Sequence, residues 1–423
     1  MSLKKSKLAM AMAAAAGLTF SSGAFATNGI IQAGNGMVAH GMGGAGLANA
    51  SEAASGMDNP ALISQTGDSI SVAWSMFAPD READFTDVAF GLGDAKSDAK
   101  LFAIPQIAFT SKISDSLSWG IMAYALGGMN TDYREDPFSK FWAGFLYSGS
   151  DLRSSSVDLS GMIIAPTLSF KVNKDIDVGA SLLIGYENLR LRNMFGLDTY
   201  ANFVGASTRQ ETNEGSAVGY GAKLGVNWRI NDGIAVGVIV QPKMSMDEIS
   251  YFKDVLKPFG FTGDAGLALP NEFGVGGKFA VGKTVDINAD LMYYQWKSVD
   301  VFEFFGWDNQ IVYKLGAEWR ATDKLALRAG FNYGKSPIQG DAMSKASAFP
   351  IGDISAVIAN YMFPAISEQH YTVGLGYKMD KNLAVNAYYL YSPKTTITDT
   401  TGSGGALSMS QNAFGLGVNY TAK

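Results

Sequence analysis

Hydrophobic and polar residues alternate over long stretches of this 423-residue chain. In the segment 217–230, AVGYGAKLGVNWRI, every second residue from Val218 to Ile230 is apolar or aromatic, and the residues between them are small, polar or charged. Side chains of a β-strand point alternately to the two faces of a sheet, so this period of two predicts a strand with one apolar face. The same alternation recurs at 311–320, 325–333, 371–378 and 414–420.

Tight turns and long connections separate these segments in strict alternation. Six connections are short and rich in Asn, Asp and Gly, as in Asn231-Asp232-Gly233, and such residues close β-hairpins. Seven are long, and the thirteen connections together predict fourteen strands. The expected strands are 68–80, 101–113, 116–130, 157–172, 176–192, 214–230, 234–248, 270–281, 284–297, 310–321, 324–334, 368–379, 383–394 and 410–421.

The lengths of the strands and connections favour a membrane barrel over a soluble sandwich. Alternation over about ten residues, with aromatic residues near the strand ends, is typical of membrane-spanning strands. Only a closed barrel satisfies strand backbones inside lipid. We therefore predict an all-β fold, a 14-stranded antiparallel transmembrane β-barrel over residues 67–423. Residues 27–66 lack alternation and are too few to fold alone, so we expect them to form an N-terminal hatch (plug) inside the lumen.

The first 26 residues have the pattern of a secretory signal peptide. Lysines within 4–7 precede an apolar stretch at 8–20 and an A-x-A sequence at 24–26. The apolar stretch is shorter than the ~20 residues of a transmembrane helix, which disfavours the alternative of a membrane anchor. We expect export, with cleavage after Ala26.

Composition narrows the possible functions. The net charge of −6 provides no basic surface for nucleic acid. The chain has no Cys and two His, which argues against disulfides and transition-metal sites. His40 lies in the hatch, and His370 shares the lumen-facing parity of Thr372, with no convergent hydroxyl or carboxylate set of the kind a barrel hydrolase needs. We expect neither enzymatic activity nor a cofactor nor a metal.

Four segments carry a family resemblance. They are MGGAG at 42–46 with NPAL at 59–62, SWGIMAYALGGM at 118–129, LALRAGFNYGKSPI at 325–338 and PAISEQHYTVGLGY at 364–377. In this order, the chain resembles the FadL/TodX family of outer-membrane transporters for long-chain fatty acids and hydrocarbons, over nearly its whole mature length.

The resemblance implies a monomeric barrel in the bacterial outer membrane that takes up a hydrophobic small molecule by passive diffusion. Ligand would enter through a groove among the outer loops and leave sideways into outer-membrane lipid, through a gap at a kinked third strand. The ligand class stays open between long-chain fatty acids or similar lipids and monoaromatic or alkane hydrocarbons. A solute porin is disfavoured, because it would lack a plug rich in Gly and Ala.

Two motifs are candidate parts of this path. Pro60 fixes its own φ and holds Asn59 extended, Asn59 can bond nearby backbone, and Ala61 permits close approach. This Asn59-Pro60-Ala61 hatch motif is an ordinary plug turn or, as the family implies, a turn against the barrel wall near the kink. Gly127 and Gly128 interrupt the third strand, where paired glycines mark a bulge that opens the wall or, alternatively, simple packing.

Two further sets concern ligand binding. Apolar residues in the outer loops form a candidate groove, or simply pack together: Phe195, Tyr200, Phe203, Phe252, Val255, Leu256 and Phe259. Strand parity points three cations into the lumen as candidates for a ligand carboxylate: Lys223, Lys314 and Arg328. The alternative is that they pair with the inward-facing acids Glu187, Asp286, Asp290 and Glu318.

Overall fold

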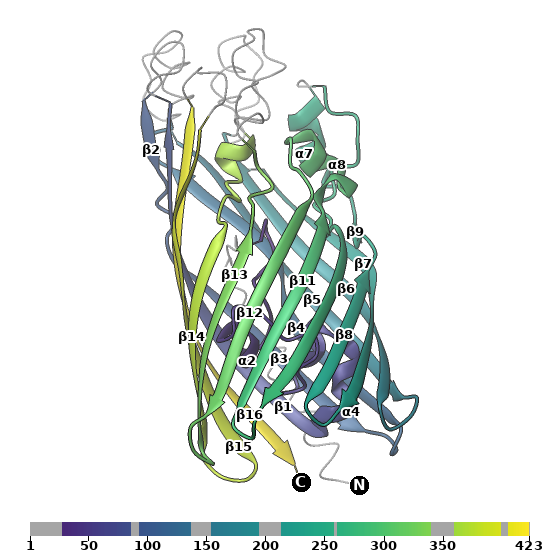
Figure 1. The fold of residues 1–423 in the computed structure, drawn as a ribbon. Coiled ribbons are helices and arrows are strands. Elements are labelled where there is room, and N and C mark those ends of the chain that lie inside the picture. Colours follow the sequence, from purple (N-terminus) through teal and green to yellow (C-terminus); the bar gives the residue numbers. More distant parts are fainter. Residues whose placement is uncertain are drawn as a thin grey trace, which may run out of the picture.

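The computed structural model describes residues 28–85, 93–136, 154–193, 213–257, 260–339, 359–398 and 405–422. Every strand in these residues belongs to one antiparallel sheet, and β1 pairs with β16 so that the sheet closes into a barrel (Figure 1). Among the described residues, fourteen strands form the wall, which confirms the predicted fold class.

The wall strands are β1 (Asp68–Asp84), β3 (Phe102–Lys112), β4 (Leu117–Tyr133), β5 (Ser155–Lys171), β6 (Ile176–Arg192), β7 (Asn213–Asn231), β8 (Ile234–Gln241), β10 (Asn271–Val281), β11 (Val285–Gln295), β12 (Gln310–Arg320), β13 (Leu325–Gly334), β14 (Gln369–Lys378), β15 (Leu383–Thr398) and β16 (Ala406–Ala422). Two short strands, β2 (Asp94–Lys96) and β9 (Ser245–Met246), pair with β1 and β7. The helices are α2 (Met37–His40), α3 (Ser55–Asp58), η1 (Pro60–Leu62), α4 (Ile63–Thr66), α7 (Ser250–Leu256), η5 (Trp296–Ser298) and α8 (Asp300–Phe304). None of these helices is long and apolar enough to cross a membrane.

Strand β8 shows where the sequence pattern misleads. The alternation predicted a strand to 248, but β8 ends at Gln241. Pro242 follows it and has no N–H group to donate to the ladder. The chain then leaves the wall, and Met244 pairs with Leu269. At the other extreme, β1 continues four residues beyond its predicted end at 80, to Asp84.

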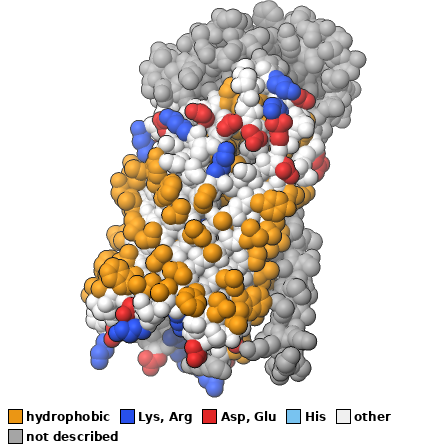
Figure 2. Space-filling view, turned by 90° about the vertical axis from the view of Figure 1, so that its right-hand side faces the viewer, with side chains coloured by type: hydrophobic (Ala, Val, Ile, Leu, Met, Phe, Trp, Pro, Cys, Tyr) orange, Lys and Arg blue, Asp and Glu red, His pale blue; other side chains and the backbone are white. Residues whose placement is uncertain are grey.

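The two faces of the wall differ as the parity predicts. On β7, Tyr220, Leu224 and Trp228 are exposed on the outside, whereas Lys223 and Asn227 are buried against the lumen. Figure 2 shows the resulting apolar belt, with charged residues gathered above and below it. Such a belt is the surface that a bilayer covers in membrane barrels. Asp68 pairs with Ala422 at the end of the barrel with the tight turns, here termed the periplasmic end, and the opposite end is the outer end.

Residues 28–66, here termed the lumen segment, lie inside the barrel and contact strands around its circumference (Figure 1). Helix η1 contacts β5, β6 and β7, whereas α2 contacts β14, β15 and β16. Backbone N–H groups of the segment donate to lumen side chains: Gly43 to Thr372 Oγ1 at 2.8 Å and Gly46 to Asp290 Oδ2 at 2.7 Å.

The glycines of the segment MGGAG permit the closest of these approaches. Gly43 has a φ of +68° and lies so near β13 that a Cβ would come within 2.7 Å of the Phe331 backbone. On the wall, Gly330 faces Met42 and Gly43 without a side chain between them. Backbone therefore rests on backbone here, which explains why glycines occur both in the lumen segment and on the facing strand.

Candidate functional site

The Asn59-Pro60-Ala61 turn fastens the lumen segment to itself and to the wall. Asn59 is extended and fully buried, and helix η1 begins at Pro60. The Asn59 Oδ1 atom accepts from Ala61 N at 3.0 Å, while Nδ2 donates to Leu47 O at 2.7 Å and to Val226 O at 3.1 Å. One side chain thus caps η1, joins two parts of the lumen segment and bonds β7.

The turn docks on bare backbone of the wall. Pro60 and Ala61 rest on Gly179 of β6 and Gly225 of β7, where any Cβ would overlap the turn. Helix η1 contacts β5, β6 and β7, while the flanking helices α3 and α4 contact β4, and Asp58, directly before the turn, lines a pocket together with Leu126 of β4. The turn fits there for a steric reason, because the two glycines leave a patch of bare backbone on which a rigid turn can dock.

The third wall strand, β4, contains a bulge. Its register with β5 shifts between Ala125 and Gly127, which leaves Leu126 as the extra residue. A Cβ on Gly127 would come within 2.9 Å of Ile30 O, so the lumen segment approaches the strand closely at this point. Gly128 follows and pairs with Ser160. The two predicted glycines therefore lie at and directly after an irregularity in the strand.

Next to the bulge, the ladder between β3 and β4 is interrupted. The two strands pair only from Ile107–Ala123 to Lys112–Ser118, towards the periplasmic end. Further out, residues 102–106 of β3 pair with β1, and β4 pairs with β5 up to Tyr133. Within the described residues, no backbone pairing joins 102–106 to 124–129. We call this stretch the β3–β4 break.

A lumen pocket adjoins the bulge. Its walls come from the lumen segment, β4, β7, β10, β11 and β12, and they include Tyr124, Leu126, Lys223, Glu272, Tyr294 and Lys314. The pocket has room for a few water molecules. It combines apolar surface with two cations and with the buried carboxylate of Asp58 from the lumen segment.

The two lysines of the pocket differ in their partners. Lys223 Nζ lies 3.6 Å from Glu272 Oε2 and donates to Met57 O at 3.3 Å. In the described part of the chain, the Lys314 ammonium has neither a hydrogen bond nor an ion pair. Burial raises the pKa of Asp58, and the positive charge of Lys314 opposes that rise.

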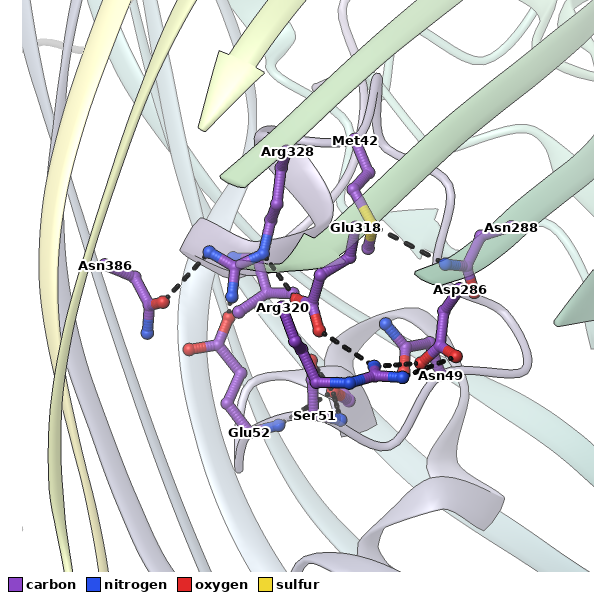
Figure 3. Close-up of polar contacts among 12 residues, drawn as sticks. Met42, Asn49, Ser51, Glu52, Asp286, Asn288, Glu318, Arg320, Arg328 and Asn386 are labelled. Atoms are coloured by element: carbon purple, nitrogen blue, oxygen red, sulfur yellow. Dashed lines mark hydrogen bonds and ion pairs between the residues drawn. The ribbon is translucent and has the colours of Figure 1, made fainter. Parts of the chain in front are cut away.

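Arg328 belongs to a separate polar cluster nearer the periplasmic end (Figure 3). Its Nε donates to Glu318 Oε2 at 2.7 Å, and its Nη1 donates to Asn386 Oδ1 at 3.0 Å. Arg320 bridges Glu318 to Asp286 in the same cluster. The predicted pairing with lumen acids is thus present for Arg328, while Lys223 pairs with Glu272, an acid outside the predicted set.

Part of the predicted loop groove lies outside the described residues, namely Phe195, Tyr200, Phe203 and Phe259. On α7, Phe252 and Leu256 are fully buried and Val255 is partly buried. Phe252 approaches Phe363, with ring centroids 6.5 Å apart, in an aromatic cluster at the outer end that includes Trp296, Phe302, Phe305 and Trp307. The Trp296 ring rests directly on Gly29, at the start of the lumen segment.

Comparison with known proteins identifies the family. A family model described as "Outer membrane protein transport protein (OMPP1/FadL/TodX)" matches residues 12–423. The chain belongs to this family. It is a protein of the bacterial outer membrane, as the sequence predicted. No group of three or more His, Asp or Glu side chains suited to hold a metal occurs in the part that the structure describes.

Individual relatives are distant. The chain is 22% identical to the long-chain fatty acid transport protein of Escherichia coli, with 98% of both chains covered. It is 21% identical to outer membrane protein P1 of Haemophilus influenzae, with 75% of both chains covered. The crystal structure of the Pseudomonas putida toluene transporter TodX covers 92% of this chain with a TM-score of 0.66 at 17% identity, with 99% of that chain covered. This likeness shows a shared fold.

Proposed function

We propose that this protein takes up hydrophobic small molecules across the outer membrane by passive diffusion. The observation that carries the proposal is the β3–β4 break beside the β4 bulge, because this interruption of the wall adjoins a lumen pocket. An apolar molecule that reaches the β3–β4 break lowers its free energy by moving into the hydrocarbon of the surrounding membrane. The names of two similar proteins, a long-chain fatty acid transport protein and a toluene transporter, support the same class of cargo.

The path that we propose has three parts. Ligand collects at the aromatic cluster of the outer end, which touches the lumen segment through Trp296 and Gly29. It moves to the pocket beside Leu126 and leaves sideways through the β3–β4 break. The pocket holds only a few water molecules, so passage requires the start of the lumen segment, near Ile30, to shift.

The lumen segment, residues 28–66, acts in this scheme as the hatch that the sequence predicts over 27–66. Its contacts with β5–β7 on one side and β14–β16 on the other block the direct route to the periplasm. The Asn59-Pro60-Ala61 turn is the fixed part, since three hydrogen bonds and two wall glycines hold it. The Ile30 region is the part next to the bulge, so the two ends of the hatch have different tasks.

The cargo that we favour is a long-chain fatty acid or a similar lipid. Lys314 is the best placed of the three predicted cations, because its ammonium borders the pocket without a fixed partner in the described residues. A carboxylate there would gain a charge-assisted hydrogen bond. The alternative cargo, a monoaromatic or alkane hydrocarbon, would make no use of this charge.

Uptake by intact cells tests the function. The full chain would be expressed in a host that lacks its own transporter for hydrophobic compounds, and uptake of labelled oleate and toluene would be measured beside liposome swelling with sugars. We expect expression to increase uptake of at least one hydrophobic compound and to leave sugar permeation at background. Sugar-driven swelling without hydrophobic uptake would instead indicate a solute porin and contradict the proposal.

A further inference from the structure

Arg81 lies on the lumen face of β1, near the outer end, with 1% of its surface exposed. Outward-facing residues of the same strand are apolar from Ile70 to Ala78 and charged at Asp80 and Glu82. Arg81 is therefore level with the outer edge of the apolar belt, where lipid headgroups meet the acyl chains.

The guanidinium of Arg81 reaches across the outer end of the β3–β4 break. Its Nη1 donates to Asn130 O of β4 at 2.7 Å and to Ala99 O at 3.3 Å. Just beyond, Asp98 N donates to Asp132 O at 2.8 Å, so the wall closes again at this level. Arg81 thus marks the outer limit of the break, as the Ile107–Ala123 pair marks its inner limit.

The rest of the guanidinium is unused. Nε and Nη2 are both buried without a hydrogen-bond partner, and no Asp or Glu of the described residues forms an ion pair with Arg81. A buried cation that lacks an anion is costly, and stable proteins usually neutralise one. The cost indicates that the anion comes from outside the described residues.

The geometry of the unused atoms selects the kind of anion. The N–H groups of Nε and Nη2 lie on one edge of the planar guanidinium and point in parallel. Two parallel donors match the two oxygens of a carboxylate, which is the reason that arginine binds carboxylates in a bidentate manner. The Nη1 atom can keep its bonds to Asn130 and Ala99 while this edge binds, but the edge is buried, so the side chains that cover it must shift to admit a carboxylate.

We propose that Arg81 binds the carboxylate of the transported ligand at the outer end of the β3–β4 break. The carboxylate then stays at headgroup level while the hydrocarbon chain enters the acyl region through the break. The inference rests on the proposed function and names its substrate class as monocarboxylates with long apolar chains. It adds a second carboxylate position to the one at Lys314, which belongs to the pocket deeper in the lumen.

The aromatic side chains nearby suit such a ligand. Phe85 follows Arg81 with the same parity, and its ring meets Tyr361 edge to face with centroids 5.5 Å apart. Tyr133, three residues after Asn130 on β4, stacks on the Tyr361 ring, with ring centroids 4.1 Å apart. All three rings are buried, and an ion pair formed among buried apolar side chains is stronger than one in water.

The test compares an acid with its uncharged ester. Binding of laurate and of methyl laurate to the purified full-length barrel would be measured for the wild type, Arg81→Lys and Arg81→Met. Lysine keeps the charge and a donor for Asn130 O but lacks the paired edge. We expect Arg81→Lys to weaken laurate binding about tenfold and Arg81→Met to weaken it further. The affinity for methyl laurate should stay within about twofold of the wild-type value in both variants.

Arg134→Lys is the matched control, because Arg134 is exposed beside the break and pairs with Asp98. It should leave the acid-to-ester ratio unchanged. An acid-to-ester affinity ratio in Arg81→Lys equal to that of the wild type would overturn the inference. If both affinities fall equally, Arg81 only braces the wall. Wild-type protein that binds neither ligand would also overturn the inference, whereas the proposed function fails only if cells expressing the protein take up neither oleate nor toluene.

A measurement on the wild type covers the case in which the variants fail to fold. Laurate should shift the Arg81 Nε–H resonance in the nuclear magnetic resonance spectrum, and methyl laurate should leave it in place. Identical spectra with the two ligands would overturn the inference without any substitution.

Discussion

Asn59→Ala is expected to loosen the lumen segment without opening the barrel. The substitution removes the side chain that bonds Leu47 O, Val226 O and Ala61 N, at distances of 2.7, 3.1 and 3.0 Å. The site is fully buried, so water does not replace these bonds. The wall is unaffected in this account, since β6 and β7 keep their continuous pairing through Gly179 and Gly225.

The size of the effect follows from the bonds lost. A typical buried hydrogen bond contributes about 0.5–1.5 kcal/mol net, so three of them contribute roughly 2–4 kcal/mol to docking of the segment. Since about 1.4 kcal/mol corresponds to a tenfold change in an equilibrium constant, the undocked population should rise by about 30- to 1,000-fold.

Hydrogen–deuterium exchange measures that population directly. Peptides covering 47–62 should exchange faster by the same factor, while peptides from the wall strands should keep their protection. Ser51→Ala, at an exposed position of the same segment, serves as the control and should change little. Unchanged exchange in 47–62 would refute the claim that Asn59 holds the segment, and equal loss of protection in the wall would refute its local character.

Three further predictions concern the path and its charges. Gly128→Trp should block uptake of hydrophobic compounds while the barrel still shows heat-modifiable migration on gels, and normal uptake would show that the bulge is not part of the path. Lys314→Met should weaken laurate binding about tenfold and leave the affinity for methyl laurate unchanged. Equal effects on both ligands would exclude a contact between Lys314 and the ligand carboxylate. Burial lowers the pKa of His40 to about 4, so protonation of the undocked segment should weaken docking as the pH falls from about 6.5 towards 4. The protection factors of 37–47, which correct exchange for the intrinsic rate at each pH, should fall towards acid pH in the wild type and fall less in His40→Gln. Asp58→Asn should steepen this fall, because the raised pKa of Asp58 favours docking at low pH.

The sequence predicts the wall well because its two faces lie in different environments. Lipid outside and a polar lumen inside impose a period of two, and a residue such as Lys223 can be assigned to the lumen from its neighbours alone. Charge pairing is harder to predict, since Glu272 of β10 and Lys223 of β7 are 49 residues apart and meet across β8, through the registers of three strands. Parity gives the face of a residue and not its partner.

The lumen segment and the outer end are beyond the same reasoning. Residues 28–66 have no periodic pattern, so the sequence identifies the Asn59-Pro60 turn and not its dock on β6 and β7. Arg81 was missed because the predicted strand stopped at Asp80, one residue before it. The apolar parity that begins at Ile70 places Arg81 inward once the strand is allowed to continue, and that is the signal that could have found it.

Covalent closure of the β3–β4 break tests sideways exit most directly. The chain has no cysteine, so Gln106→Cys with Tyr124→Cys, the next pair in the register beyond Ile107–Ala123, would be the only thiols present. Phe109→Cys with Ile121→Cys joins two residues that are already paired and controls for the disulfide itself.

The account predicts that the oxidised Gln106–Tyr124 pair abolishes uptake, that a reductant restores it, and that the control pair transports in both states. Equal uptake before and after reduction of a disulfide that has formed completely would contradict exit through this part of the wall.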